Sequence, residues 1–468
     1  MESWALAEML GAEIKDKRRR KSMAAILSNL EQQPSLSFSA AAGPAKRQAA
    51  HRLFKHEQVE VEHLLAGHYT QTQKRIQAEC EGGLLLVVQD TTEFDFTGLK
   101  ATGGLGYINH TNARGLFGHS ALALTPEGLP LGLMHLQLWA REDADYGKGK
   151  DRRERDLSEK ESYRWIQTLQ SVEKQLPVGQ QVLFIQDREA DIFGFLQAPR
   201  RPNTFLLVRA NQPRRVEVLG EGQACPWQKS LLFNVASAAP VVASMQVSLP
   251  RAPARPKRNA ELIVQTTPVR ILAPQGRKGV SSEPVSAWIV RAYEAHPPDG
   301  QAIEWVLIST LPVPDAQTAC QLVAYYAKRW VIERLHYTIK SGGCKAEQLQ
   351  MDTLHSLEMA LALYYVTAWR LLFMTYLSRV EPEAPAACIL RPSEIEVLEK
   401  IENKPIPTIS LAMIAIAKLG GYAPYKNAPP PGVKVLWIGL RRLEDMEVGW
   451  LLATQNQPWS TTKDMIQD

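Results

Sequence analysis

Two apolar runs, each ending in an aspartate, constrain the fold of this chain most strongly. They are GLLLVVQD, residues 83–90, and QQVLFIQD, residues 180–187. Short apolar runs closed by polar residues are typical of buried β-strands. A helix is expected over residues 158–175 between them. Further strands are predicted in three other runs: 119–141, 203–210 and 303–310. This order of strands and helices predicts a mixed α/β structure built in layers.

The length of 468 residues exceeds what one ordinary core fills, so two or three domains are expected. Apolar residues at helical spacing predict a small helical domain over residues 1–75. The α/β domain is expected over residues 76–380. Short alternating runs rich in Pro, Arg and Val indicate a β-rich insertion in it, at about 211–300. A helical domain over 381–468 follows, with its last strong helix at 433–452.

Positive charge is concentrated in two segments. The formal net charge is +5, which permits a polyanionic partner without demanding one. Six of the seven residues 15–21 are basic, and a second basic cluster spans residues 251–258. Such side chains either contact phosphates, as in most sequence-independent DNA binding, or simply solvate a surface. The candidate phosphate contacts are Arg18, Arg19, Arg20, Arg255 and Arg258.

Cysteine usage and hydropathy indicate the compartment. Five cysteines are scattered without a CxxC pair, which favours a reducing compartment and argues against structural zinc. The N-terminus lacks the apolar core of a signal peptide. The most apolar stretch, residues 359–377, contains Arg370, so we interpret it as a buried helix and not a membrane span. We therefore expect a cytoplasmic protein that does not act at a membrane.

A polar stripe is predicted on one helix. Tyr326, Arg329, Glu333 and Lys340 are separated by three, four and seven residues. At roughly 100° per residue they fall within about 60° of one another, while apolar residues occupy the opposite face. An acid, two bases and a phenol on one edge of a core-packed helix suggest a site that handles phosphate and metal.

Three carboxylates are candidates for metal binding. Asp90 and Asp187 are each expected at the end of a strand, and Glu333 lies on the helix with the polar stripe. Magnesium typically takes one or two carboxylates together with phosphate oxygens and water. Two such ions can activate a nucleophile and stabilise the leaving oxygen in phosphoryl transfer. The order, spacing and type of the three carboxylates favour this interpretation.

Each carboxylate also has an ordinary explanation. An aspartate at a strand end often forms a turn or caps a helix. Glu333 and Arg329 have the i,i+4 spacing of a helix-surface ion pair. Other carboxylates close by in the chain are alternative ligands: Glu93, Asp95, Glu189 and Asp191.

The stretch DREADIF, residues 187–193, and the pattern Tyr-x2-Arg-x3-Glu-x6-Lys resemble the insertion-sequence-four family of bacterial transposases, most closely its Tn-five type. The resemblance extends through nearly the whole chain. It includes DKRRRKSM near the N-terminus, QDTTEFDF and EWVLIST in the middle, and PGVKVLWIGLRRLEDMEVGW near the C-terminus. Tyr337 is a departure, because the Tn-five type has a lysine there. A tyrosine can still hydrogen-bond a phosphate, but it brings no charge.

The resemblance implies an RNase H-like catalytic core with a β-strand insertion, flanked by helical domains. It implies a DDE triad of Asp90, Asp187 and Glu333 that binds two Mg²⁺ ions, for which Mn²⁺ can substitute. The implied activity is cut-and-paste transposition on double-stranded DNA: nicking at the transposon end, hairpin formation, hairpin opening and strand transfer into target DNA. The C-terminal domain would pair two protein–DNA complexes, giving a homodimer in the synaptic complex.

The resemblance also implies roles in DNA contact. Arg329 and Lys340 would hold phosphates near the cut, and Tyr326 would hydrogen-bond a backbone phosphate. Arg209 matches a position that approaches the transposon end, although it is also an ordinary strand-end arginine. Trp305 matches a tryptophan that stacks on a base flipped out of the hairpin, which recovers lost stacking energy. Its alternative role is packing in a core strand.

Two other functional classes fit parts of the pattern. A non-catalytic DNA-binding regulator, or a decayed transposase copy, would keep the basic N-terminus without needing the carboxylates. A structure-selective nuclease on the same fold would need the carboxylates but not the tryptophan, the insertion and the C-terminal helices together. Because the carboxylates and the basic N-terminus are both present, we favour an active transposase.

Overall fold

The computed structural model describes most of the chain. The described residues are 4–14, 16–32, 54, 59–108, 113–142, 156–218, 228–249, 258–275, 281–297, 302–425 and 428–454.

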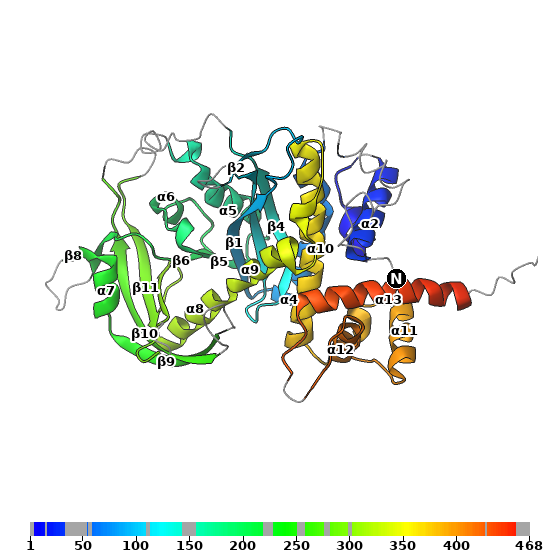
Figure 1. The fold of residues 1–468 in the computed structure, drawn as a ribbon. Helices are drawn as coiled ribbons and strands as arrows, with labels where there is room; N and C mark the ends of the chain where they lie inside the picture. The colour runs from blue at the N-terminus through cyan, green and yellow to red at the C-terminus, as the bar shows by residue number, and fades with distance from the viewer. Residues whose placement is uncertain are drawn as a thin grey trace, which may run out of the picture.

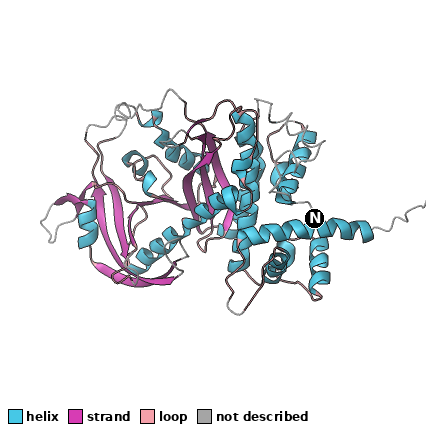
Figure 2. Ribbon diagram, in the orientation of Figure 1, coloured by secondary structure: helices cyan, strands magenta, loops and turns pink. Residues whose placement is uncertain are grey.

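A mixed β-sheet of twelve strands runs through the molecule (Figures 1 and 2). The strand order is β2-β3-β1-β5-β6-β12-β11-β10-β7-β8, with β4 paired to β3 and β9 paired to β10. The strands are β1 (Leu84–Asp95), β2 (Gly106–Tyr107), β3 (Arg114–Leu124), β4 (Pro130–Trp139), β5 (Gln181–Gln186), β6 (Thr204–Arg209), β7 (Arg215–Val218), β8 (Gln228–Leu231), β9 (Val241–Leu249), β10 (Arg258–Ile271), β11 (Val285–Tyr293) and β12 (Glu304–Ser309). This sheet and its helices confirm the predicted α/β class.

The two runs that predicted buried strands lie side by side. Strand β1 pairs in parallel with β5, with Leu84 opposite Gln181 and Val88 opposite Ile185. Their apolar side chains are almost fully buried because helices cover the sheet. Asp90, expected at the end of its strand, instead lies inside β1. The strand continues to Asp95 because β3 keeps pairing with it after β5 has ended.

Helices flank the sheet and build one end of the molecule (Figure 2). They are α1 (Trp4–Leu10), α2 (Lys17–Gln32), α4 (Val61–Cys80), α5 (Arg164–Gln175), α6 (Phe193–Leu196), α7 (Leu232–Ala238), α8 (Ala316–Lys328), α9 (Trp330–Tyr337), α10 (Leu354–Val380), α11 (Pro392–Glu402), α12 (Ile409–Leu419) and α13 (Val433–Thr454). Helices α4, α5 and α10 all contact β4. Helix α10 is long and apolar enough to cross a membrane, but 89% of its apolar window is buried inside the protein.

The N-terminal helices are joined to the sheet by a buried polar cluster. The carboxylate of Glu8 on α1 lies 2.6 Å from Nδ1 of His68 and accepts a hydrogen bond from Arg75 at 2.7 Å. Nε2 of His68 accepts the backbone N–H of Leu133 on β4 at 3.0 Å. Since this bond leaves the proton on Nδ1, a neutral His68 donates to Glu8. The cluster ties α1 and α4 to the sheet.

The strands expected in the β-rich insertion extend the main sheet instead of forming a separate one. Strands β7 to β11 continue it outward from β12, and α7 packs beside β10 and β11. At the other end of the molecule α13 crosses α11 and α12 and projects beyond them (Figure 1). One continuous apolar core runs from α1 to α13. The four described cysteines are free thiols.

Candidate active site

Asp90 and Asp187 come from neighbouring parallel strands. Continuing the β1–β5 register two residues past Val88 and Ile185 brings Asp90 level with Asp187, on one face of the sheet. Gln186 ends β5, so Asp187 is the first residue beyond that strand. The strand order therefore places the two carboxylates together.

Asp90 is a largely buried carboxyl group with one cation nearby. Its Oδ1 accepts the N–H of Thr91 at 2.8 Å, and its Oδ2 lies 3.6 Å from Nη1 of Arg329. Burial raises the pKa of Asp90 to about 7 against the lowering effect of Arg329, and the charges of Asp187 and Glu333 add to the rise. Arg329 alone therefore does not balance the three acids.

His336 does not supply the missing charge. Its Nδ1 lies 3.9 Å from Oδ2 of Asp90, and its Nε2 lies 3.3 Å from the hydroxyl of Ser120. Burial, assisted by the positive charges of Lys340 and Arg329, lowers the pKa of His336 to about 3. The imidazole is therefore neutral at neutral pH.

Asp187 caps a short turn. Its Oδ1 accepts the backbone N–H of Glu189 at 2.8 Å, at the start of the turn η5 (Arg188–Ala190). The capping role considered from sequence is thus present. It uses one oxygen, and within the described residues Oδ2 of Asp187 has no hydrogen bond. Capping and metal binding are compatible at this residue.

The helix expected to carry the whole polar stripe is broken, so the single-helix prediction is wrong. Helix α8 ends at Lys328, Arg329 forms a turn, α9 begins at Trp330, and the π-helix η6 (Thr338–Gly342) follows. The Arg329 side chain is 13% exposed and lies between the carboxylates of Glu333 and Asp90. Burial lowers the pKa of Arg329, but these acids and Tyr326 raise it overall. The position of the Arg329 side chain therefore depends on Asp90, which is distant in sequence, as well as on Glu333 four residues away.

The arrangement offers oxygen ligands but no ready metal site. Among the described residues, no three His, Cys, Asp or Glu side chains form a group that could hold a metal ion as they stand. Arg329 occupies the place of a cation between Asp90 and Glu333. Three carboxylates suit a hard divalent cation. The raised pKa of Asp90 shows that its surroundings supply too little positive charge to balance a buried carboxylate. The three carboxylates are thus the kind of donors that magnesium takes, while Glu333 is paired with Arg329 in this structure.

Most of the alternative carboxylates are engaged elsewhere. Asp191 is buried against Arg214. Asp95 accepts hydrogen bonds from the backbone and the hydroxyl of Thr97 at 2.9 and 2.6 Å. Glu189 pairs with an arginine of α5 at 3.0 Å. These contacts give Asp191 and Asp95 structural partners, whereas Glu93 is exposed on β1. The choice of Asp90, Asp187 and Glu333 as metal ligands stays a prediction.

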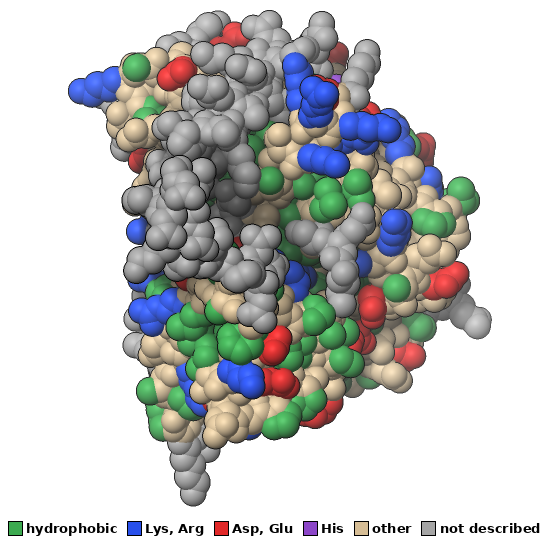
Figure 3. All heavy atoms as spheres, turned by 90° about the vertical axis from the view of Figure 1, so that its right-hand side faces the viewer, with side chains coloured by type: hydrophobic (Ala, Val, Ile, Leu, Met, Phe, Trp, Pro, Cys, Tyr) green, Lys and Arg blue, Asp and Glu red, His purple; other side chains and the backbone are tan. Residues whose placement is uncertain are grey.

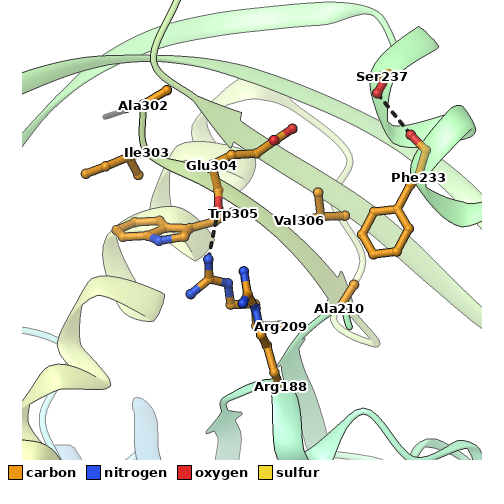
Figure 4. A pocket seen from close by; sticks show the side chains of 10 residues that line it. All are labelled: Arg188, Arg209, Ala210, Phe233, Ser237, Ala302, Ile303, Glu304, Trp305 and Val306. Atoms are coloured by element: carbon orange, nitrogen blue, oxygen red, sulfur yellow. Dashed lines mark hydrogen bonds between the residues drawn. The ribbon is translucent and has the colours of Figure 1, made fainter. Parts of the chain in front are cut away.

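A pocket of about 550 Å³ is lined by Arg188, the residue that follows Asp187, and by residues of β6, α7 and β12 (Figure 4). Arg209 and Arg188 point into it, and Nη2 of Arg209 donates to the carbonyl of Glu304 at 3.0 Å. The indole of Trp305 forms one wall, with its ring centroid 5.2 Å from that of Tyr326 in an edge-on contact. The structure thus brings Arg209 and Trp305 together, with an aromatic side chain supporting the indole.

Tyr326 lies behind this wall. The side chain is buried, and its hydroxyl interacts with Arg209. Burial raises the pKa of Tyr326, so it stays a neutral phenol. It therefore supports Arg209 and Trp305 directly, while its contact with a DNA phosphate stays a prediction.

Lys340 and Tyr337 lie at the other end of the broken helix. Nζ of Lys340 donates to the carbonyl of Glu93 at 2.7 Å and lies 3.1 Å from the carboxylate of Glu347. Tyr337 is 42% exposed, and Arg334 lies 4.7 Å from its ring centroid. Lys340 is therefore held close to β1, whereas Tyr337 is open to a ligand.

The basic segment of α2 contains side chains in different settings. Arg18 is exposed, and Arg19 lies 3.8 Å from the carboxylate of Asp16. Nη1 of Arg20 donates to the carbonyl of Leu10 at the end of α1 at 3.1 Å. Arg20 thus also stabilises the helix end. Figure 3 views the side where α2, α11 and α13 lie, and shows Lys and Arg side chains gathered in its upper part.

The second basic segment is described only in part. Arg255 lies outside the described residues. Arg258 begins β10 and forms a bidentate pair with the buried carboxylate of Glu294, one bond being 2.9 Å. The pair gives Arg258 a structural role in the sheet extension.

Two arginines of the site were not singled out from sequence. Arg188 follows Asp187 directly and lines the pocket, and its place in the DREADIF stretch was a usable signal. Arg164 on α5 donates to the hydroxyl of Thr91 at 3.1 Å and to Glu189 at 3.0 Å. It thereby bridges the segments next to the two aspartates. The place of Arg164 in the stretch EKESYRW, residues 159–165, which also resembles the family's catalytic core, was a usable signal.

One comparison with known proteins bears on this site. Residues 1–59 match the family model described as transposase DNA-binding. The matched range includes α1 and α2 with their basic residues. The match supports DNA as a partner and a transposase as the class of protein.

Proposed function

We propose that this protein is a cut-and-paste DNA transposase of the insertion-sequence-four family, of its Tn-five type. The observation that carries the proposal is that Asp90 and Asp187 lie opposite each other along adjacent parallel strands. The negative charge of Glu333 is close enough to raise the pKa of Asp90. The match of residues 1–59 supports the DNA-binding half of this activity. The order β3-β1-β5-β6, with β3 antiparallel and the others parallel, supports an RNase H-like core.

Asp90, Asp187 and Glu333 would hold two Mg²⁺ or Mn²⁺ ions. When bound, such ions stabilise the charge that develops on the phosphoryl group and favour ionisation of the attacking hydroxyl. In the free protein Arg329 balances Asp90 and Glu333. Metal loading would release its guanidinium for a DNA phosphate, where a planar fork of donors binds well.

The pocket that Arg188 and Trp305 line suits the hairpin step. A hairpin bends the backbone sharply and unstacks a base, at a cost on the order of a few kcal/mol. Trp305 offers an aromatic face at the pocket wall, and Arg188 and Arg209 supply positive charge for the adjoining backbone. The pocket would therefore hold the flipped base while the freed 3′-hydroxyl attacks the opposite strand.

Synapsis would use α13. Part of its surface is apolar and open, with Met446 43%, Val448 52% and Leu452 73% exposed. A homodimer formed through this helix would bring two transposon ends together. A protein that cuts and joins chromosomal DNA is expected in the bacterial cytoplasm, away from membranes.

A non-catalytic DNA-binding regulator is the second candidate. It is favoured by the Arg329–Glu333 pair, because the described residues do not form a ready metal site. Such a protein would bind transposon ends and leave them uncut. The distinction is therefore a matter of chemistry on DNA.

The deciding experiment incubates the protein with its element's end DNA and target DNA, then resolves products on a denaturing gel. Magnesium should yield nicks, hairpins and joined strands, whereas calcium should permit complex assembly without chemistry, since it coordinates at longer distances in looser geometry. D90N, D187N and E333Q should bind the end without cutting it. Binding without products in magnesium would favour the regulator, and cleavage without joining would favour a nuclease.

A further inference from the structure

Asp191 is a buried carboxylate that the triad does not use. Its side chain is fully buried, at 0% exposure. One oxygen, Oδ2, accepts the backbone N–H groups of Asn211 and Gln212, each at 2.7 Å. The other, Oδ1, accepts Nε of Arg214 at 2.6 Å. Three donors therefore fix this carboxylate, and it fixes the loop 211–214 in return.

The loop held by Asp191 leaves the strand that carries Arg209. Ala210 follows Arg209, and its N–H donates to the carbonyl of Val306 at 2.8 Å. Val306 is the neighbour of Trp305 on β12, and all four residues line the pocket. One side of this segment is thus attached to the pocket strand, and the other side is attached to Asp191.

Asp191 also closes the turn η5, which follows strand β5 and Asp187. Its backbone N–H donates to the carbonyl of Arg188 at 3.2 Å, closing the turn that Asp187 caps. A single side chain therefore connects the turn after Asp187 to the segment that carries Arg209. We infer that Asp191 is a positioning residue that keeps the pocket of Arg209 and Trp305 in register with the carboxylate of Asp187.

This inference rests on the proposed function, and it predicts different effects on nicking and on hairpin formation. The first nick needs the triad and the scissile phosphate but no flipped base. Hairpin formation needs the flipped base and the reacting phosphate held at the same time. A displacement of about 1 Å between groups that must act together can slow a reaction by as much as about 10²-fold. Loosening the Asp191 connection should therefore slow the hairpin step selectively.

Glu173 provides a matched control at the opposite end of β6. Glu173 is 9% exposed, and its carboxylate accepts the backbone N–H of Arg201 at 2.8 Å. It thus holds the segment that enters β6, whereas Asp191 holds the segment that leaves it. E173Q and D191N each replace a buried carboxylate that receives loop N–H groups. Only D191N acts next to the pocket.

The test measures nicking of intact ends and hairpin formation on pre-nicked ends in single turnovers, for the full-length protein and both variants. D191N should nick at the wild-type rate and form hairpins about tenfold more slowly or worse. An abasic site at the flipped position should restore part of that loss. E173Q should leave the ratio of the two rates unchanged. R214K, which keeps a charge but not the planar donor group, should resemble D191N in a weaker form.

Hydrogen exchange on the free protein supplies a readout that does not depend on chemistry. D191N should lose protection at the amides of Asn211 and Gln212, and E173Q should lose it at Arg201. Equal slowing of nicking and hairpin formation by D191N, or equal rate ratios in both variants, would overturn the positioning role. Unchanged protection at residues 211 and 212 would overturn it too. Absence of hairpins from the wild-type protein would instead overturn the proposed function.

Discussion

Asp90 shows how the free protein prepares a site for positive charge. Its carboxyl group is 14% exposed, and burial is the largest cause of its raised pKa of about 7. Arg329 compensates only in part, because it is shared with Glu333. A divalent ion with ordered ligands would satisfy all three acids better than one guanidinium does.

The raised pKa predicts how stability depends on pH in metal-free protein. Since Asp90 binds its proton more tightly when folded, stability is lost as pH rises from about 4, near its unfolded pKa, through about 7. D90N lacks this loss, so above pH 7 it should be more stable than wild type by about 4 kcal/mol. Denaturant unfolding at a series of pH values, with a chelator present, measures the difference. A difference that does not change with pH would show that Asp90 has an ordinary pKa.

Trp305 should matter for the hairpin steps and not for the first nick. An aromatic platform returns about 1–3 kcal/mol per stacked base, so W305A should slow hairpin formation roughly tenfold or more. Timed gels on intact and pre-nicked ends measure this. W288A, a change of the same kind on the adjacent strand β11, is the control and should slow neither step. Equal slowing of both steps by W305A would mean that the indole only packs in the sheet.

At the residue level, the order and type of residues along the chain were enough to predict candidate metal ligands but not to choose between neighbouring acids. The aspartates that close the two apolar runs, together with the order and spacing of the three acids, indicated Asp90, Asp187 and Glu333. Sequence reasoning could not tell Asp187 from Asp191, since both follow β5 in the same short stretch. Only the donors that surround each side chain separate an open carboxylate from one buried against Arg214.

The break between α8 and α9 is a feature of elements that local sequence cannot predict. The apolar spacing from Val331 to Ile339 is helical throughout, and these side chains are buried as expected. The interruption at Arg329 accompanies ion pairs with Asp90, a residue more than two hundred positions away in the chain. Tertiary contacts thus override a regular helical pattern.

Helix α2 should supply phosphate contacts from its exposed side chains. R18A with R19A should weaken end binding and lower the salt slope by about one unit for each phosphate contact that is lost. R20A should also destabilise the N-terminal helices, because Arg20 bonds the end of α1. Filter binding at several salt concentrations measures the slope, with K418A on α12 as the control. An unchanged slope in the double variant would mean that these arginines only solvate the helix.

Helix α13, in the domain expected to pair two complexes, exposes only part of its apolar surface. Val433, Leu436, Leu440 and Leu443 pack in the protein's own core. Ile438 is 36% exposed, and several residues nearer the end of the helix are also open, among them Val448 and Leu452. A deletion from Val433 would therefore damage the fold as well as any interface. Point substitutions on the exposed side test synapsis more cleanly.

V448E with L452E should keep the fold and end binding but prevent paired-end complexes. Charged side chains are costly in an apolar interface and harmless on an exposed surface. Sedimentation of protein with end DNA separates single-end from paired-end complexes. I401E on α11, where Ile401 is 45% exposed, is the matched control. Paired-end complexes formed normally by the double variant would remove α13 from the interface.

At the level of the whole molecule, the strands predicted in the β-rich insertion belong to the main sheet. The β-rich insertion shares its hydrogen bonds with the central strands through β12, and one apolar core continues into the terminal helices. The composition and the short alternating runs of residues 211–300 predicted that this insertion contains strands. They could not predict which strands pair, because pairing depends on partners distant in sequence.

We propose that Asp90, Asp187 and Glu333 together hold divalent metal ions for phosphoryl transfer. Anomalous diffraction from a crystal of the protein with pre-cleaved end DNA and Mn²⁺ tests it most directly. We predict manganese peaks in contact with all three carboxylates, with Arg329 turned from Glu333 toward a DNA phosphate. Manganese bound only at other acids, or a site still occupied by the Arg329–Glu333 pair with DNA in place, would contradict the claim.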